Sequence, residues 1–189
     1  TITPSADSLN KKLYITPANL ATNIHRTIEA NFNYKILKKI FNNNKYFTVA
    51  EPLISSSVLG DEGAANHTRF CTDYLDPGIG LFVYGQEYFN KNQKKPKKYP
   101  ARQTLEASVA IARQHQLDFD KLLFFQQSPE AIDHGVFHND VCAVGNKNLL
   151  LCHEYAYVNQ KNNLNKLKNI CEKNNIDLKI HEILHKDLN

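Results

Sequence analysis

Methionine is absent from the 189-residue sequence, and its four cysteines show neither a CxxC pair nor a spacing typical of zinc sites. Because no methionine starts the chain, we expect it to be a segment of a longer protein. The cysteine spacing argues against a metal centre and favours reduced, structural thiols. The sequence also lacks a secretory apolar segment and any apolar run long enough to cross a bilayer, so we expect a cytoplasmic protein without membrane contact.

The charge is mildly basic, with a formal net charge of +4 and a pI near 8.8. Much of the excess lies in residues 90–100 (NKNQKKPKKYP), a run typical of a solvated loop. A nucleic-acid-binding module is the alternative, with Tyr88, Phe89 and Tyr99 stacking on bases. A single basic segment without a known nucleic-acid motif argues against that alternative, so we expect no nucleic-acid partner.

Strand and helix patterns alternate along the chain. The clearest helix, 101–116, carries Leu105, Val109 and Ala112 on one stripe and follows Pro100. Asn33 is the expected N-cap of a second helix. Strands are predicted at 12–20, 46–53, 78–85, 121–127, 141–145, 148–157 and 177–184, and helices at 33–43, 101–116 and 163–174, with a helical turn at 128–133.

This order approximates a repeating ββαβ unit of roughly 50–60 residues and predicts an α/β fold. A unit of that size cannot close a core alone and needs neighbours, as the blades of propeller-type repeats do. We therefore expect residues 1–189 to be part of a single domain.

Two polar clusters are candidates for a functional site. In GDEGAANH (60–67), Asp61 and Glu62 lie between two glycines. The spacing alone favours a turn in which Asp61 caps and Gly63 takes a positive φ. The functional alternative is an anionic cup for a guanidinium, which a carboxylate binds through two hydrogen bonds. The second cluster is FHND (137–140), where His138 and Asp140 fit either a satisfied core pair or a general acid/base beside a carboxylate.

Three cations extend this set. Arg102 is expected in the first turn of the 101–116 helix, where a cation opposes the helix dipole. That conflict with stability points to anion binding. His25 and Arg26 are expected in a loop after a strand, and their spacing fits an anion contact or an ordinary exposed pair equally well.

Several blocks in one order resemble the N-succinylarginine dihydrolase family of the guanidine-modifying (pentein) superfamily. The resemblance runs through nearly the whole chain and is weakest at 90–98 and in the Asn/Lys-rich C-terminal helix. The blocks are LGDEGAANHTR (59–69), LFVYGQE (81–87), YPARQTLEAS (99–108), GVFHNDV (135–141) and LLLCHEYAY (149–157).

The resemblance implies a five-bladed α/β propeller of ββαβ units, about three of which fall in this chain, and a homodimer. It also implies hydrolysis of the guanidino group of N2-succinyl-L-arginine to N2-succinyl-L-ornithine, ammonia and carbon dioxide in arginine catabolism. In the family a cysteine thiolate attacks the guanidinium carbon, and the covalent adduct is then hydrolysed without a metal or organic cofactor.

By the same resemblance, Glu62 matches the catalytic carboxylate and His138 the catalytic acid/base. The matched substrate-binding positions are His25, Arg26, Arg102 and Asp140. The family's nucleophile lies beyond the end of this chain and matches none of Cys71, Cys142, Cys152 and Cys171, so we expect the segment alone to be inactive. The remaining alternative is a protein that binds an arginine derivative without turning it over.

Overall fold

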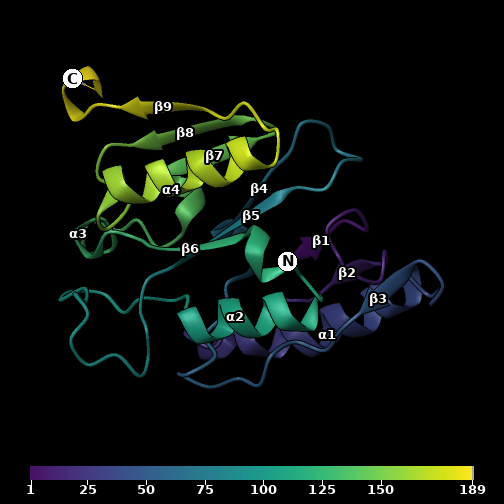
Figure 1. Cartoon of the computed structure of the whole chain (residues 1–189). Helices are drawn as coiled ribbons and strands as arrows, with labels where there is room; N and C mark the ends of the chain where they lie inside the picture. Colours follow the sequence, from purple (N-terminus) through teal and green to yellow (C-terminus); the bar gives the residue numbers. More distant parts are fainter. Residues whose placement is uncertain (189) are drawn as a thin grey trace.

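Three ββαβ units follow one another in the computed structural model, which describes residues 1–188 (Figure 1). The first unit contains β1 (Ile2–Thr3), β2 (Leu13–Ile15), α1 (Ile24–Ile40) and β3 (Phe47–Val49). The second contains β4 (His67–Phe70), β5 (Ile79–Tyr84), α2 (Leu105–Gln114) and β6 (Leu122–Gln126). The third contains β7 (Ala143–Asn146), β8 (Leu149–His153), α4 (Gln160–Lys173) and β9 (Lys179–Ile183). A short helix, α3 (Pro129–Asp133), and three 3-10 turns lie in the connections, and a fourth 3-10 turn follows β9.

Each unit has the same strand pairing. The first strand pairs antiparallel with the second, and the second pairs parallel with the third across the helix that joins them. A parallel neighbour requires a crossover connection, which is why each helix lies between the second and third strand of its unit. The mixed α/β class predicted from the sequence is confirmed, and within residues 1–188 the sheets do not close into a barrel.

The main core lies between the second and third sheets. β5 (IGLFVY) is buried along its whole length, as expected for a strand covered on both faces. α4 places Leu164, Leu167 and Cys171 at helical spacing against this core, and its lysines lie on the outer face. Figure 1 shows α4 lying across the third sheet, and β4 contacts β7, so the two sheets are neighbours.

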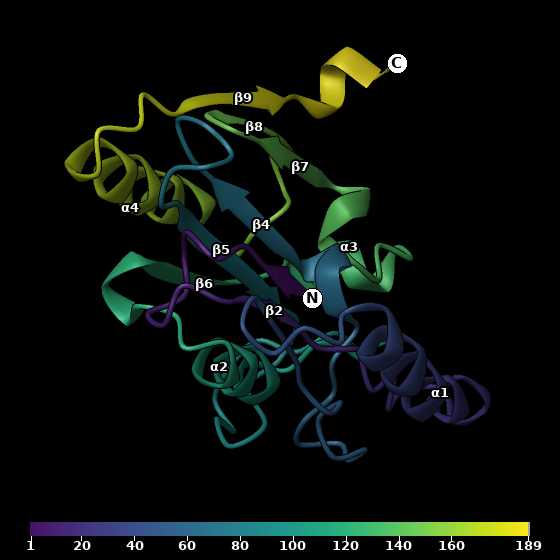
Figure 2. The same ribbon diagram turned by 90° about the vertical axis from the view of Figure 1, so that its right-hand side faces the viewer.

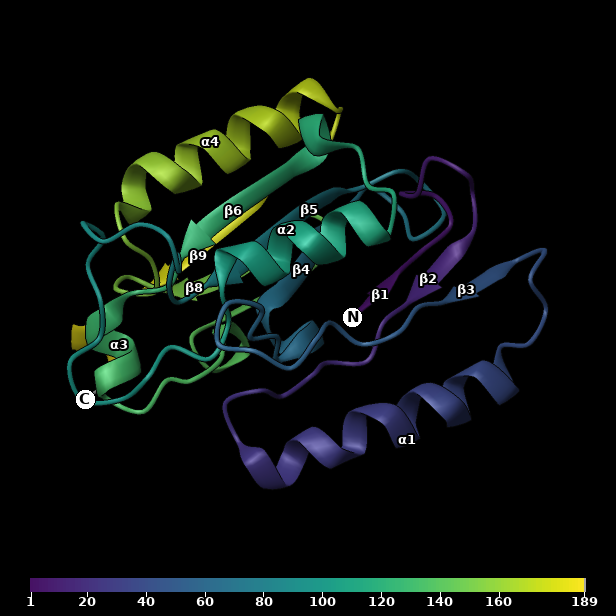
Figure 3. The same cartoon turned by 90° about the horizontal axis from the view of Figure 1, so that it is seen from below.

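The three crossover helices lie on the outside of the molecule. Figure 2 shows α4, α2 and α1 around the periphery, with the first strands of the three sheets closer to the middle. Figure 3 shows the same helices in succession from α4 through α2 to α1. This arrangement brings the loops at the starts of α1, α2 and η3 (Asn139–Val141) towards one another.

Two predicted helix boundaries are wrong. α1 begins at Ile24, not at residue 33, with Asn23 at its N-cap, so His25 and Arg26 lie in its first turn and not in a loop. α2 begins at Leu105, because Thr104 accepts a hydrogen bond from the Ala107 N–H and forms the cap. Arg102 therefore precedes α2, and the argument from the helix dipole does not apply to it.

The predicted cap of the helical turn at 128–133 is confirmed. Ser128 accepts a hydrogen bond from the Ala131 N–H, and Pro129 is the first residue of α3. The first strands of the first two units, β1 and β4, were not predicted. No helix among residues 1–188 is long and apolar enough to cross a membrane.

Candidate active site

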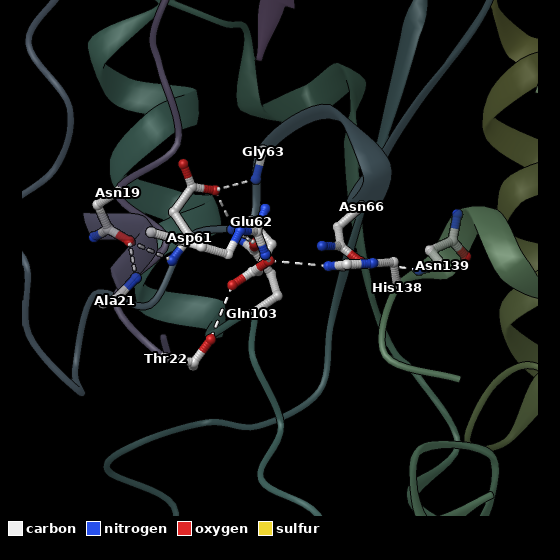
Figure 4. Close-up of polar contacts among 11 residues, drawn as sticks. Asn19, Ala21, Thr22, Asp61, Glu62, Gly63, Asn66, Gln103, His138 and Asn139 are labelled. Carbon is white, nitrogen blue, oxygen red and sulfur yellow. Dashed lines mark hydrogen bonds and ion pairs between the residues drawn. The ribbon is translucent and has the colours of Figure 1, made fainter. Parts of the chain in front are cut away.

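The Glu62 carboxylate is the point where two distant segments meet (Figure 4). His138 Nε2 lies 3.0 Å from Glu62 Oε2, and Arg26 Nη1 donates to the same oxygen at 3.2 Å. Thr22 Oγ1 donates to Oε1 at 2.9 Å. The Glu62 side chain is only 1% exposed, whereas those of His138 and Arg26 are 24% and 35% exposed. A buried carboxylate is thus bound by groups that reach solvent.

The loop that holds Glu62 is fixed by hydrogen bonds to the Gln103 side chain and to Asp61. Gln103 Oε1 accepts the Glu62 N–H at 2.8 Å, and Gln103 Nε2 donates to Asp61 Oδ1 at 3.1 Å. Gly63 has φ +76° and donates to Asp61 Oδ1, so the predicted turn, with Asp61 capping, is confirmed. Glu62 still points away from this turn to His138, which shows that the turn and the polar cluster coexist.

The pKa values of the two neighbouring acids, Asp61 and Glu62, are shifted in opposite directions. Burial alone would raise the pKa of Glu62, but hydrogen bonds from His138 and Thr22 and the charge of Arg26 outweigh it, so this pKa lies below its usual value. Burial raises the pKa of Asp61 above its usual value. Glu62 is therefore the ionised acceptor of the site, and Asp61 mainly orders the loop.

His138 stands directly before the 3-10 turn η3 with extended backbone (φ −132°, ψ 152°). The following residue, Asn139, is buried, and its N–H donates to Asn66 Oδ1 at 3.0 Å. Asn66 ends the 3-10 turn η1 (Gly63–Asn66), whose N-cap is Glu62. The Asn139 N–H therefore joins the two segments in addition to the Glu62–His138 side-chain contact. In a polar site this arrangement can hold a cation on Glu62 and exchange a proton through His138.

Arg102 lies in a separate cavity beside the Glu62 cluster. Its guanidinium is 4.3 Å from the centre of the Phe137 ring, within the range of cation–π contacts. The cavity measures about 270 Å³ and is lined by Thr22, Ser55, Ser56 and Arg102 among others. Because Thr22 also contacts Glu62, this cavity adjoins the buried carboxylate.

Two predicted site residues lie apart from Glu62. Asp140 is exposed and lines a different cavity of about 370 Å³ with Ala64 and Lys147. His25 is exposed in the first turn of α1, next to Arg26. The structure thus brings Glu62, His138 and Arg26 into contact and places Arg102 next to them. It leaves Asp140 and His25 outside this contact.

The sequence reasoning missed Thr22 and Gln103. Both contact the Glu62 loop directly, and both stand close to residues that were singled out, Thr22 three residues before His25 and Gln103 directly after Arg102. Gln103 follows Arg102 in PARQT, so its role becomes visible only when the chain places that segment against residues 60–63.

The four cysteines have no activated thiol among them. Burial raises the pKa of Cys142 to about 11 and those of Cys152 and Cys171 to about 12, and it also raises the pKa of Cys71. Within residues 1–188 no cluster of three or more His, Cys, Asp or Glu side chains has the geometry to hold a metal ion.

Comparison with known proteins shows which family the sequence matches and which proteins are similar to it. A sequence profile of the succinylarginine dihydrolase family matches residues 1–189. A protein of Shewanella loihica named N-succinylarginine dihydrolase is 56% identical over 164 residues, which is 87% of this chain and 37% of that protein. Relatives of the same name from Shewanella putrefaciens and Shewanella sediminis are 53% and 54% identical over 168 residues, which is 89% of this chain and 38% of each relative. The chain therefore spans less than two fifths of these relatives.

Proposed function

The chain belongs to the succinylarginine dihydrolase family, and we propose that the complete protein containing it hydrolyses the guanidino group of N2-succinyl-L-arginine. Two water molecules are consumed, and N2-succinyl-L-ornithine, two molecules of ammonia and one of carbon dioxide are formed. The observation that carries the proposal is the hydrogen bond between Glu62 and His138, which joins two segments 76 residues apart.

Glu62 is proposed to hold the cationic guanidinium of the substrate. The Arg26 contact supports this role, because a guanidinium with the chemistry of the substrate's own reacting group already lies against the carboxylate. A carboxylate whose pKa is lowered stays ionised at neutral pH and can keep the substrate cation in place.

His138 is proposed to act as the general acid/base. In each round a cysteine thiolate attacks the guanidinium carbon, or the carbon of the ureido intermediate, and His138 donates the proton that lets ammonia leave. It then takes a proton from the water that breaks the carbon–sulfur bond, which gives the ureido intermediate in the first round and a carbamate in the second. The carbamate loses carbon dioxide and leaves the free amine of succinylornithine. The thiolate is proposed to come from outside this chain, because none of the four cysteines matches the family's nucleophile and burial raises the pKa of each. Residues 1–189 alone are proposed to be inactive.

The anionic parts of the substrate are proposed to bind the nearby cations. The cavity beside Arg102 adjoins Glu62 through Thr22, so a substrate with its guanidinium on Glu62 can extend a carboxylate towards Arg102. Arg26 and His25 are assigned to the other carboxylate, and Asp140 to a further polar contact with the substrate. No metal or organic cofactor takes part in this proposal.

The three ββαβ units are proposed to be three blades of a five-bladed propeller that forms one domain. Their identical strand pairing supports this assignment, as does the greater length of the relatives. The resemblance of the sequence further suggests a homodimer, and a cytoplasmic location remains an expectation from the sequence. Light scattering on the complete protein tests the dimer, and a monomer at micromolar concentration contradicts it.

The test of the function is product analysis. The complete protein is incubated with N2-succinyl-L-arginine and, separately, with L-arginine, and products are identified by mass spectrometry and ammonia assay. We expect succinylornithine with two ammonia per molecule from the first substrate and little turnover of the second. Binding of succinylarginine without products would establish the binding-only alternative.

A further inference from the structure

Asn66 stands between the two segments that carry Glu62 and His138. It is 3% exposed and occupies the last position of η1, four residues after Glu62. Its side-chain oxygen accepts the N–H of Asn139, the residue directly after His138. Figure 4 shows Asn66 beside the His138 side chain.

The direction of the Asn66 amide is fixed by this contact. A backbone N–H needs an acceptor, so the side-chain oxygen and not the nitrogen must face Asn139. The nitrogen is then left buried and, within residues 1–188, without a hydrogen-bond partner. A buried donor without a partner destabilises the fold, so stability alone does not select asparagine at this position.

The contact is part of a chain of buried hydrogen bonds. Asn139 Oδ1 accepts from the Tyr157 hydroxyl at 2.9 Å, and Tyr157 lies just before α4 of the third unit. Asn66, Asn139 and Tyr157 are all nearly inaccessible to water. The main-chain segment that carries His138 is thus held from both sides, by the Glu62 loop and by the start of α4.

We propose that Asn66 is a positioning residue, which fixes the distance between Glu62 and His138 by holding the backbone of Asn139. The catalytic consequence rests on the proposed function, whereas the structural claim does not. A hydrogen bond between side chains depends on where their backbones are anchored, and a misplacement of about 1 Å in such a site can cost on the order of 10²-fold in rate. Asn66 therefore acts through His138 and does not itself touch the substrate.

The first test measures the Glu62–His138 contact in the complete protein. The titration midpoint of the Glu62 side-chain carbonyl carbon is followed by NMR in the wild type and in Asn66→Ala. The His138 hydrogen bond helps to lower the pKa of Glu62, so a looser contact moves the midpoint upward. Asn163→Ala is the matched control, since its amide nitrogen donates to the Val158 carbonyl in the third unit and not to the Glu62 site.

A second pair of variants protects the test against misfolding of Asn66→Ala. Asn139→Pro removes the N–H that Asn66 accepts, and Asn139→Ala keeps that N–H while removing the same side chain. Proline is tolerated at the first position of a helical turn, and the extended backbone of His138 suits a residue before proline. We expect a larger upward shift of the Glu62 midpoint in Asn139→Pro than in Asn139→Ala.

The activity test uses the complete protein. We expect Asn66→Ala to lower kcat by about tenfold or more with a smaller change in KM, because positioning of a catalytic group acts mainly on the chemical step. An unchanged Glu62 midpoint and unchanged kcat in folded Asn66→Ala would overturn the inference. If instead the wild-type protein releases no ammonia from succinylarginine while the midpoint still shifts in Asn66→Ala, the proposed function fails and the positioning role stands.

Discussion

Replacing Glu62 by glutamine removes one negative charge from the centre of the site with little change in shape. The carboxylate is buried and accepts from Thr22, His138 and Arg26. Hydrogen bonds to a charged group contribute about 1.5–3 kcal/mol each, and bonds between neutral groups about 0.5–1.5 kcal/mol. His138 and Arg26 are 24% and 35% exposed, so water replaces part of what they lose. We expect Glu62→Gln to lower the free energy of unfolding by about 1–3 kcal/mol at pH 7.

The difference in the free energy of unfolding between wild type and Glu62→Gln must depend on pH. The folded state lowers the pKa of Glu62, so the stabilisation is complete above the pKa of the unfolded chain, about 4.3. It is lost as the pH falls through the still lower pKa of the folded state. We therefore expect the stability gap between wild type and Glu62→Gln to be present from pH 7 to pH 5.5 and to shrink below about pH 4.

Urea unfolding of the complete protein, followed by circular dichroism between pH 3 and pH 7, measures this gap. Asp73→Asn is the matched control, because Asp73 forms an exposed ion pair with Lys147 and its loss is expected to change little. A gap that is absent at pH 7, or that persists undiminished at pH 3, would refute the assignment of Glu62 as the ionised acceptor of the site.

Three further predictions concern other residues. In the complete protein, His138→Ala is expected to lower the rate of ammonia release by at least about 10²-fold while succinylarginine still binds. Steady-state assays measure the rate and calorimetry measures the binding. Full activity of the variant would show that His138 is not the general acid/base. Arg102→Ala is expected mainly to raise KM, and an unchanged KM with a collapsed melting temperature would mark Arg102 as structural. Burial lowers the pKa of His115 to about 3, so below about pH 6.5 the unfolded chain takes up a proton that the folded chain does not. The free energy of unfolding should therefore fall by up to about 1.4 kcal/mol for each pH unit below that value, and it should fall less steeply in His115→Gln. An equal pH slope in both proteins would contradict the burial of a neutral imidazole between Thr3 and Thr16.

Much of the fold follows from local sequence signals. The apolar run of β5 and the Ser128–Pro129 start of α3 are determined by nearby residues, and both were predicted with nearly correct limits. β1 and β4 were not predicted, because β1 has only two residues and β4 (HTRF) contains no apolar run.

The error in α1 has a specific cause. Apolar and polar residues are mixed around this helix without a clear apolar stripe, so the periodicity does not reveal which residues face the sheet. Ala30 is buried and Leu37 is half-buried, whereas Ile24, Ile28 and Phe32 on the outward face are exposed. The outward residues made the first half of the helix look irregular, and the prediction therefore started at residue 33.

The residues of the site also fall into two groups, those that the sequence indicated and those that only the folded structure reveals. The resemblance pointed to Glu62 and His138, and the structure places them in hydrogen-bond contact. Thr22, Gln103 and Asn66 could not be found from the sequence, because each acts across a long chain separation that only the folded arrangement closes. Polar residues that support a site from a distance in sequence carry no local pattern of their own.

The most direct test of the central claim, that Glu62 and His138 act as one unit, is a double-mutant cycle on ammonia release by the complete protein. The cycle compares kcat/KM for the wild type, Glu62→Gln, His138→Ala and the protein with both changes. Residues that act as a unit show strongly non-additive losses, so we predict that the double variant is about as slow as the slower single variant. Losses that multiply in the double variant would show that the two residues act independently and would contradict the account.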